Sequence, residues 1–209
     1  MKHLIIIIIL LLSCTANICN AQFEATYAQD IDAEATFRQK IGIQFGYNCS
    51  TINGTAVYGK MKTGVNVGVT ADIPLTDKWL VRPGILLTMK GFQMECGKDD
   101  FYNKDFNFLE MPVLAVYQIG VSDNCSVELQ CGPYFSYGLF GKSDSPFYYY
   151  KVNTFSVYKS FDWGANFGVG LNVFRFYIGA SYDFGFVSVI HHALHHCIMA
   201  NVGYRFWCE

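Results

Sequence analysis

The stretch FDWGANFGVGLNV, residues 161–173, alternates between two kinds of residue. Every second residue is apolar, beginning with Phe161, while the residues between them are glycine, asparagine or aspartate, beginning with Asp162. A period of two predicts a β-strand whose two faces differ in chemistry. Alternation alone does not say which face meets water, lipid or a packed interior, so composition and the rest of the chain must decide.

The composition indicates that part of the protein surface does not face water. Charged residues make up 15% of the 209-residue chain, against about 25% in ordinary soluble domains. Aromatic residues make up 17%. The formal net charge of −2 gives no footprint for nucleic acid, so we expect no nucleic-acid partner.

The N-terminal residues predict export. Lys2 precedes an uninterrupted apolar run from Leu4 to Leu12, which is too short to span a bilayer as a helix but suits a signal peptide. We expect cleavage after Ala21. The alternative is lipidation of Cys14, which ends a lipobox-like stretch, and either route takes the protein out of the cytoplasm.

Eight two-periodic segments follow one another, with no amphipathic helix between them. They cover residues 40–49, 62–72, 79–91, 107–119, 126–138, 161–173, 175–187 and 197–207. Short connections at 73–78, 120–124 and 174 alternate with long ones at 50–61, 92–106, 139–160 and 188–196. An even strand number with short turns at one end and long loops at the other is typical of outer-membrane barrels.

Glycine content assigns the two faces of these strands. One class of alternate positions is aliphatic and aromatic, as in Ile41, Ile43 and Phe45, whereas the other is rich in glycine and amides. Glycine weakens a strand, so this many glycines are unexpected on a water-facing side. Glycine is useful where space is short, as in the lumen of an eight-stranded barrel, which has room only for side chains. We therefore predict an all-β fold, an eight-stranded antiparallel up-and-down transmembrane β-barrel with its apolar face toward lipid. A soluble barrel or sandwich is the alternative.

Several strands resemble a known family. DWGANFGVGLNV (162–173), FRFYIGASYDFGF (174–186) and ANVGYRF (200–206) resemble the last three strands of the PorT-like outer-membrane β-barrel proteins of Bacteroidetes. GPYFSYGLFGK (132–142) resembles their fifth strand and KTGVNVGV (62–69) their second. The resemblance implies a place in the outer membrane of a Gram-negative bacterium and insertion by the outer-membrane assembly machinery. Such barrels commonly end on an aromatic residue, whereas this chain continues for three residues after Phe206.

Seven charged residues occupy positions that should face the lumen. They are Arg82, Lys90, Glu110, Glu128, Asp162, Asp183 and Arg205. Buried charges must be paired and hydrogen-bonded, so we expect a mutually paired plug. The alternative is a pore lining that sets selectivity or relays protons.

The stretch HHALHHC holds the candidate metal ligands His191, His192, His195 and His196, followed by Cys197. Imidazole and thiolate suit zinc or copper. In a helix, the spacing of four residues would place His191 beside His195 and His192 beside His196. The alternative is an exposed His-rich loop, and we expect no cofactor.

Two further patterns concern the outer rim. Tyr148, Tyr149, Tyr150 and Tyr158 lie in an aromatic and basic stretch that suits contact with a protein partner, or else extends two strands outward. Ser188 and His191 are near each other, but nucleophilic catalysis also needs an orienting acid, and neither a suitable carboxylate nor a GxSxG motif accompanies them.

Six cysteines remain after the expected cleavage, and none forms a CxxC pair. Barrel closure would make the strands that carry Cys49 and Cys197 neighbours. A rim disulfide between them is one alternative, although the predicted register places the two on opposite faces.

These patterns combine into one prediction. Residues 1–21 form a signal peptide, 22–38 a flexible periplasmic segment and 39–209 the barrel, with both termini periplasmic. The protein is expected to be non-enzymatic and to act structurally or to bind a partner through long extracellular loops. The alternatives are a small-solute channel or transport-associated barrel, and a membrane-embedded lipid-modifying enzyme at the outer rim.

Overall fold

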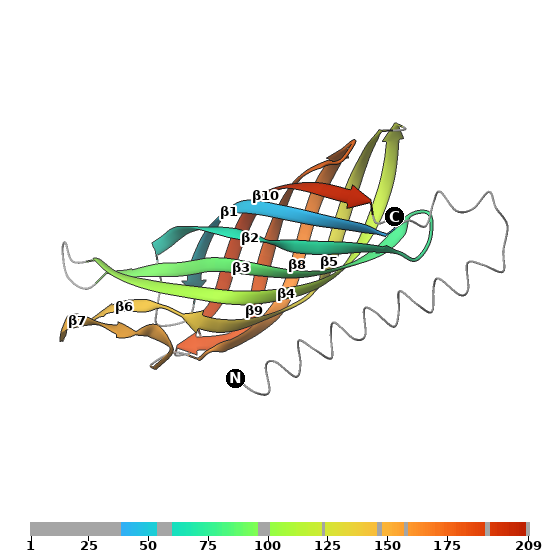
Figure 1. Ribbon diagram of the computed structural model, residues 1–209. Coiled ribbons are helices and arrows are strands. Elements are labelled where there is room, and N and C mark those ends of the chain that lie inside the picture. The colour runs from blue at the N-terminus through green and yellow to red at the C-terminus, as the bar shows by residue number, and fades with distance from the viewer. Residues whose placement is uncertain are drawn as a thin grey trace. The chain divides into compact units, whose positions relative to one another are not determined.

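The described part of the chain is a single antiparallel sheet that curls into a barrel (Figure 1). The computed structural model describes residues 39–53, 60–95, 101–122, 124–145, 148–156, 159–190 and 193–207. Its strands are β1 (Lys40–Asn53), β2 (Lys60–Pro74), β3 (Trp79–Glu95), β4 (Phe101–Ser122), β5 (Cys125–Phe140), β6 (Lys142–Ser145), β7 (Tyr148–Asn153), β8 (Phe161–Val173), β9 (Phe176–Ile190) and β10 (Ala193–Trp207). The predicted signal peptide and the segment 22–38 lie outside the described residues.

Eight of these strands form the barrel wall, in the order β3-β2-β1-β10-β9-β8-β5-β4, and a β3–β4 pairing closes it. Closure leaves no exposed strand edge in the wall. The first and last strands pair from Lys40 opposite Trp207 to Asn53 opposite Leu194, so both ends of the barrel chain lie at one end of the barrel. The predicted eight-stranded antiparallel up-and-down barrel is confirmed. No helix in the described residues is long and apolar enough to cross a membrane.

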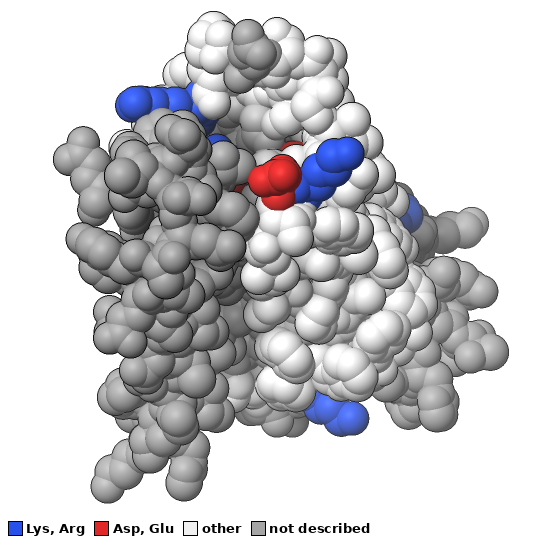
Figure 2. Space-filling view, turned by 90° about the vertical axis from the view of Figure 1, so that its right-hand side faces the viewer, with Lys and Arg blue, Asp and Glu red and all other residues white. Residues whose placement is uncertain are grey.

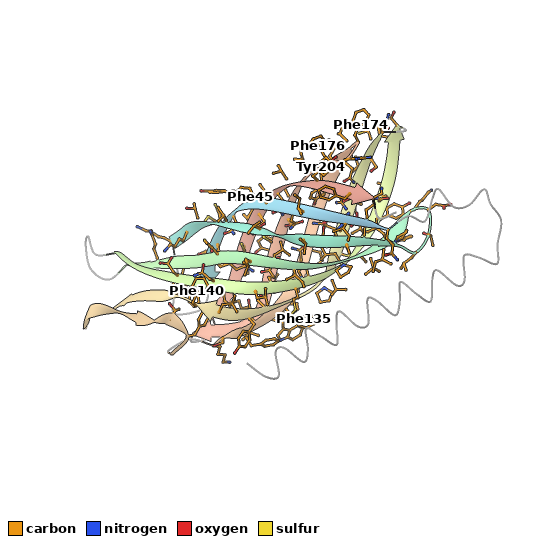
Figure 3. All side chains as sticks on the ribbon, viewed as in Figure 1. Phe45, Phe135, Phe140, Phe174, Phe176 and Tyr204 are labelled. Carbon is orange, nitrogen blue, oxygen red and sulfur yellow. The ribbon has the colours of Figure 1, made fainter. Side chains whose placement is uncertain are left out.

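The two faces of β8 answer the question that its sequence raises. Phe167 and Val169 are 55% and 54% exposed on the outside, whereas Asp162 and Asn166 are each 4% exposed in the lumen. The same division holds around the wall, and Figure 3 shows labelled aromatic side chains such as Phe45 and Phe135 on its outer side. An apolar outside around a polar inside is the arrangement of a transmembrane barrel.

Tight turns join the strands at the end where the barrel chain begins and finishes, called here the turn end. They include 75–78 and Phe174–Arg175, and β4 ends at Ser122 shortly before β5 begins at Cys125. Phe174 has φ of 56°, a left-handed conformation that two-residue hairpins require. Its side chain is 73% exposed beside Phe176, which adds to the aromatic rim of this end (Figure 3).

At the opposite end, called here the loop end, the strands run further than predicted. The expected long connection at 188–196 is wrong, because β9 continues to Ile190 and β10 begins at Ala193. Register shifts between Ala193 and Leu194 and between Leu194 and His196 interrupt the alternation there. A bulge displaces one strand against its partner, so the two-residue period does not reveal the strand.

The connection predicted at 139–160 also contains regular structure. It forms β6, β7 and the short 3₁₀ helix η1 (Thr154–Ser156). β6 pairs with β7, and Ser143 pairs with Lys104 of β4. This β6–β7 hairpin lies at the left of Figure 1, at the loop end.

Candidate functional site: the filled lumen

The arginine cluster fills the lumen near the turn end. It consists of Asp72 of β2, Arg82 of β3, Glu128 of β5 and Arg205 of β10. Arg82 Nε lies 2.6 Å from Asp72 Oδ1, and Arg82 Nη1 lies 2.9 Å from Glu128 Oε2. Arg205 is paired with the same two carboxylates, and its Nη2 is 3.4 Å from Glu128 Oε2. Two cations and two anions balance, so the cluster carries no formal net charge.

Tyr177 completes this layer. The guanidinium carbons of Arg82 and Arg205 lie 5.5 Å and 4.8 Å from the centre of its ring, within the range of cation–π attraction. The ring occupies space that two glycines leave open. A Cβ at Gly170 would lie 2.4 Å from Tyr177 Cε2, and one at Gly179 would lie 2.2 Å from its hydroxyl oxygen. The lumen-facing glycines of β8 and β9 therefore make room for an aromatic side chain.

The lysine cluster lies further along the lumen. Lys90 Nζ is 2.6 Å from Glu110 Oε2 and 2.8 Å from Asp183 Oδ2. Asn166 Nδ2 donates a 2.7 Å hydrogen bond to the other oxygen of Asp183. Lys90 Nζ also lies 4.8 Å from the ring centre of Tyr134. One ammonium group thus links carboxylates of β4 and β9 across the barrel.

Asp162 lies near the lysine cluster but is bonded differently from Glu110 and Asp183. It accepts a 3.3 Å hydrogen bond from the Tyr134 hydroxyl, and its Oδ2 is 3.9 Å from His195 Nδ1. Neither lysine nor arginine forms an ion pair with it in the described residues. The middle of the lumen therefore holds three carboxylates around the single lysine, and a tyrosine hydroxyl supports the third.

The aromatic cluster fills part of the lumen at the loop end. It consists of Phe92, Phe106, Phe108, Phe155 and His195. The Phe106 ring centre is 5.7 Å from that of Phe92 and 5.9 Å from that of Phe108, both in stacked geometry. Phe155 meets Phe106 and Phe108 edge-on at 5.7 Å, and His195 meets them edge-on at 5.6 Å and 6.0 Å.

Phe155 reaches this cluster from η1, outside the barrel wall. Gly138 of β5 makes room for it, because a Cβ at that position would lie 2.0 Å from Phe155 Cε1. The neighbouring Thr154 donates hydrogen bonds from its amide to the Gly141 carbonyl at 3.1 Å and from its hydroxyl to the Asp105 carbonyl at 2.9 Å. The connection after β7 is thereby fastened to the barrel mouth.

The arginine, lysine and aromatic clusters follow one another along the barrel. Arg205 and Asp72 lie close to the turn end, opposite Gly42 and Lys40, whereas Phe92 and Phe106 lie near the loop end of β3 and β4. Figure 2 looks onto the turn end, where only a few Lys, Arg, Asp and Glu side chains can be seen and one acidic side chain lies directly against a basic one. Most charges of the wall strands point inward instead.

The structure places all seven predicted lumen charges inside the barrel and buries each of them. Sequence reasoning missed Asp72, which joins both arginines, although its position falls in the lumen-facing class. It also missed Tyr134 and Tyr177, which are aromatic residues at positions of the polar class. Asp72 pairs with both arginines, and the two tyrosine rings contact the buried cations.

The candidate metal ligands do not share a face in the way a helix would place them. His195 and His196 are neighbours in strand β10, where successive side chains point to opposite faces. His195 is buried in the lumen, and His196 is half-buried on the outside. The described residues contain no group of three or more potential metal ligands. His191 and His192 lie outside the described residues.

The structure describes only some of the residues predicted at the outer rim. Tyr148, Tyr149 and Tyr150 form the first half of β7, while Tyr158 lies outside the described residues. Ser188 belongs to β9, and His191 lies outside the described residues. Cys49 and Cys197 are free thiols, with Cys197 buried and Cys49 half-buried.

A closed eight-stranded wall with an apolar outside and an ion-paired lumen defines a transmembrane β-barrel protein. The chain matches the model of the family described as outer membrane protein beta-barrel domain over residues 22–191. It therefore belongs to this family and is an outer-membrane barrel protein. None of the curated proteins matches the chain.

The chain is similar in fold to several solved structures of outer-membrane proteins. OprG from Pseudomonas aeruginosa has a TM-score of 0.51 at 12% identity, over 83% of this chain and 98% of that chain. Ail of Yersinia pestis, solved with the heparin analogue sucrose octasulfate, has a TM-score of 0.48 at 20% identity, over 81% and 99%. The outer membrane enzyme PagL has a TM-score of 0.42 at 10% identity, over 76% and 98%. The likeness to OprG concerns the fold alone.

Proposed function

We propose that this protein is a sealed, non-enzymatic barrel that binds a partner outside the cell through its loop end. The observation that carries the proposal is the filling of the lumen by the arginine, lysine and aromatic clusters in succession. An eight-stranded barrel has room only for side chains, and here those side chains are bonded to one another across the lumen. This filling argues against solute transport through the lumen and favours a function at the rims.

The β6–β7 hairpin is the part of the loop end best suited to contact a partner. Its strand β6 lies beside β4 beyond the end of β5, with Ser143 opposite Lys104, and β7 carries three consecutive tyrosines, Tyr148 to Tyr150. Tyrosine is enriched at protein interfaces. In this orientation the turn end and both termini lie in the periplasm.

Finer features of the proposal come from the sequence. Within its family the chain is PorT-like, is exported by a signal peptide at 1–21 and is inserted by the outer-membrane assembly machinery. The family match begins at residue 22, which supports cleavage after Ala21.

The orientation is tested with epitope tags in intact cells. A tag placed after Ser145, in the β6–β7 connection, should bind antibody on unbroken cells. The matched tag after Asp77, in a turn-end connection, should bind only after the outer membrane is opened. The reverse pattern would place the hairpin in the periplasm and contradict the proposal.

Partner binding is tested by photo-crosslinking in the same cells. A photoreactive phenylalanine at Tyr149 should give a discrete protein adduct, whereas the same group at Leu129, on the outer wall of β5, should give none. Absence of an adduct at Tyr149 and at Tyr150 would contradict partner binding by the hairpin.

The enzyme alternative has its own test. Alanine at Ser188 and at His191 should leave the lipid composition of the outer membrane unchanged. A loss of one lipid species in both variants would replace the proposal by a lipid-modifying function.

A further inference from the structure

A row of polar side chains crosses four neighbouring strands of the wall between the arginine and lysine clusters. It follows paired positions of β3, β2, β1 and β10, where Gly46 is the β1 position and Asn48 lies beside it on the same face. We call its polar members the amide row: Asn48, Asn66, Thr88 and Asn201. All four are buried, with at most 5% exposed. Along β3, Thr88 comes six residues after Arg82 and two before Lys90, so the row lies between the two clusters.

Most polar atoms of the amide row have no hydrogen-bond partner within the described part of the chain. Both amide atoms of Asn48 and of Asn66 are unpartnered, as are the Thr88 hydroxyl and the Asn201 oxygen. Burying a polar group without a partner costs free energy. In folded proteins nearly all buried polar atoms are bonded to protein or ordered water, and an exception points to water or an ion. The row therefore indicates a bound occupant.

The side chains of the row approach one another over the backbone of β1. A Cβ at Gly46 would lie 2.0 Å from Asn201 Oδ1 and 2.7 Å from Asn66 Nδ2, and one at Gly64 would lie 2.8 Å from Asn48 Oδ1. An asparagine amide presents either its oxygen or its nitrogen when its plane turns over. The amide row can therefore direct several oxygen atoms toward one common occupant.

The charges of the lumen favour a cation as that occupant. Five carboxylates but only three lysine and arginine side chains are buried in the described residues, so their formal net charge is −2. The excess lies at the lysine cluster and Asp162, because the arginine cluster is balanced. The row adjoins this excess, since Asn201 donates a 3.5 Å hydrogen bond to Ser181, two residues before Asp183 on β9. Water would satisfy the row but leave this buried charge uncompensated, which is costly.

We propose that the amide row binds one hard metal cation, sodium or calcium, through the side-chain oxygens of Asn48, Asn66, Thr88 and Asn201. Such ions take oxygen ligands, including amide carbonyls, and complete their coordination with water. These ligands are neutral, unlike the His, Cys, Asp and Glu side chains, of which the described residues contain no group of three. The ion joins β1 to β10, the first and last strands of the barrel. This inference concerns the lumen alone and does not depend on partner binding by the β6–β7 hairpin.

The test is equilibrium urea unfolding of the purified protein in phosphatidylcholine bilayers. The chloride of sodium, calcium or N-methylglucamine is varied at constant ionic strength. A ligand that binds only the folded protein raises the folding equilibrium constant about tenfold for each tenfold rise in its concentration above the dissociation constant. The wild type should show this dependence for sodium or calcium, and the salt that produces it identifies the ion. N-methylglucamine is too large for the row and should have no effect.

Variants separate the amide row from the rest of the lumen. Asn66→Leu and Asn201→Leu remove oxygen ligands at similar volume and should lose the dependence on the cation. Asn201→Asp adds a charged ligand of the same shape and should respond at a lower cation concentration. Asn172→Leu changes a lumen amide near the turn end of β8, outside the row, and should respond as the wild type does. A gel shift on heating shows that each variant is still a barrel.

Three results would overturn the proposal. Equal stability of the wild type in all three salts would leave ordered water as the occupant. The same cation dependence in the wild type and in Asn66→Leu and Asn201→Leu would place the ion elsewhere. If the leucine variants do not refold, Asn201→Asp decides, because an unchanged response in this variant would exclude the row as the ligand set.

Discussion

Arg82 is the residue on which the turn-end half of the lumen depends most. It bonds to Asp72 of β2 and to Glu128 and Gln130 of β5, so one buried side chain of β3 links three strands of the barrel. Removing one partner of a buried ion pair leaves an uncompensated charge. We expect Arg82→Ala to lower the free energy of unfolding by about 3–5 kcal/mol, measured by urea titration in lipid bilayers.

Arg175 is the matched control, because it is an exposed arginine in the turn before β9. Arg175→Ala should change the free energy of unfolding by less than about 0.5 kcal/mol. Equal effects of the two substitutions would show that the arginine cluster contributes no stability of its own.

Gly138 is the second residue with a sharp consequence. Gly138→Ala places a methyl group within the space of the Phe155 ring, and overpacking of this kind costs about 1–3 kcal/mol. The ring should leave the aromatic cluster, and protease should cleave the connection 141–160 faster. Gly120→Ala is the control, since a Cβ there meets no atom within 4 Å. An unchanged cleavage rate in Gly138→Ala would mean that Phe155 does not fasten the connection.

Among the elements, β8 gives the clearest test of which face meets lipid. Phe167 lies near the middle of the strand and Val173 at its turn end, and both point outward. Arginine on the lipid face destabilises a barrel by about 2–4 kcal/mol at the midplane and by about 0–1 kcal/mol near the interfaces. Phe167→Arg should therefore be the more destabilising of the two when unfolding is measured in bilayers. A larger loss for Val173→Arg would contradict the assigned depth.

The elements also show what sequence patterns can and cannot predict. Two-residue periodicity was enough to predict all eight wall strands, because each buries one polar face in the lumen. It missed the ends of β9 and β10, where bulges interrupt the period, and it missed β6 and β7, whose strands are short and lie outside the wall. Periodicity reports burial on one face, and the hairpin has no barrel interior to face.

For the whole molecule, the alternation along each strand predicted which side chains face the lumen. It did not predict which side chain pairs with which. Lys90 of β3 meets Asp183 of β9 because strand tilt and register bring them together across the closed barrel. Neither quantity can be read from one strand. The position of Phe155 in the lumen could not be predicted for a different reason. This side chain enters the lumen from a connection and not from a wall strand.

The central claim for the whole molecule is that this outer-membrane barrel is sealed. Single-channel recording of the purified protein in planar lipid bilayers tests it most directly. The arginine, lysine and aromatic clusters together predict no defined conductance steps for the wild type. Uniform, reproducible steps from the wild type would show an open path through the lumen and contradict the claim.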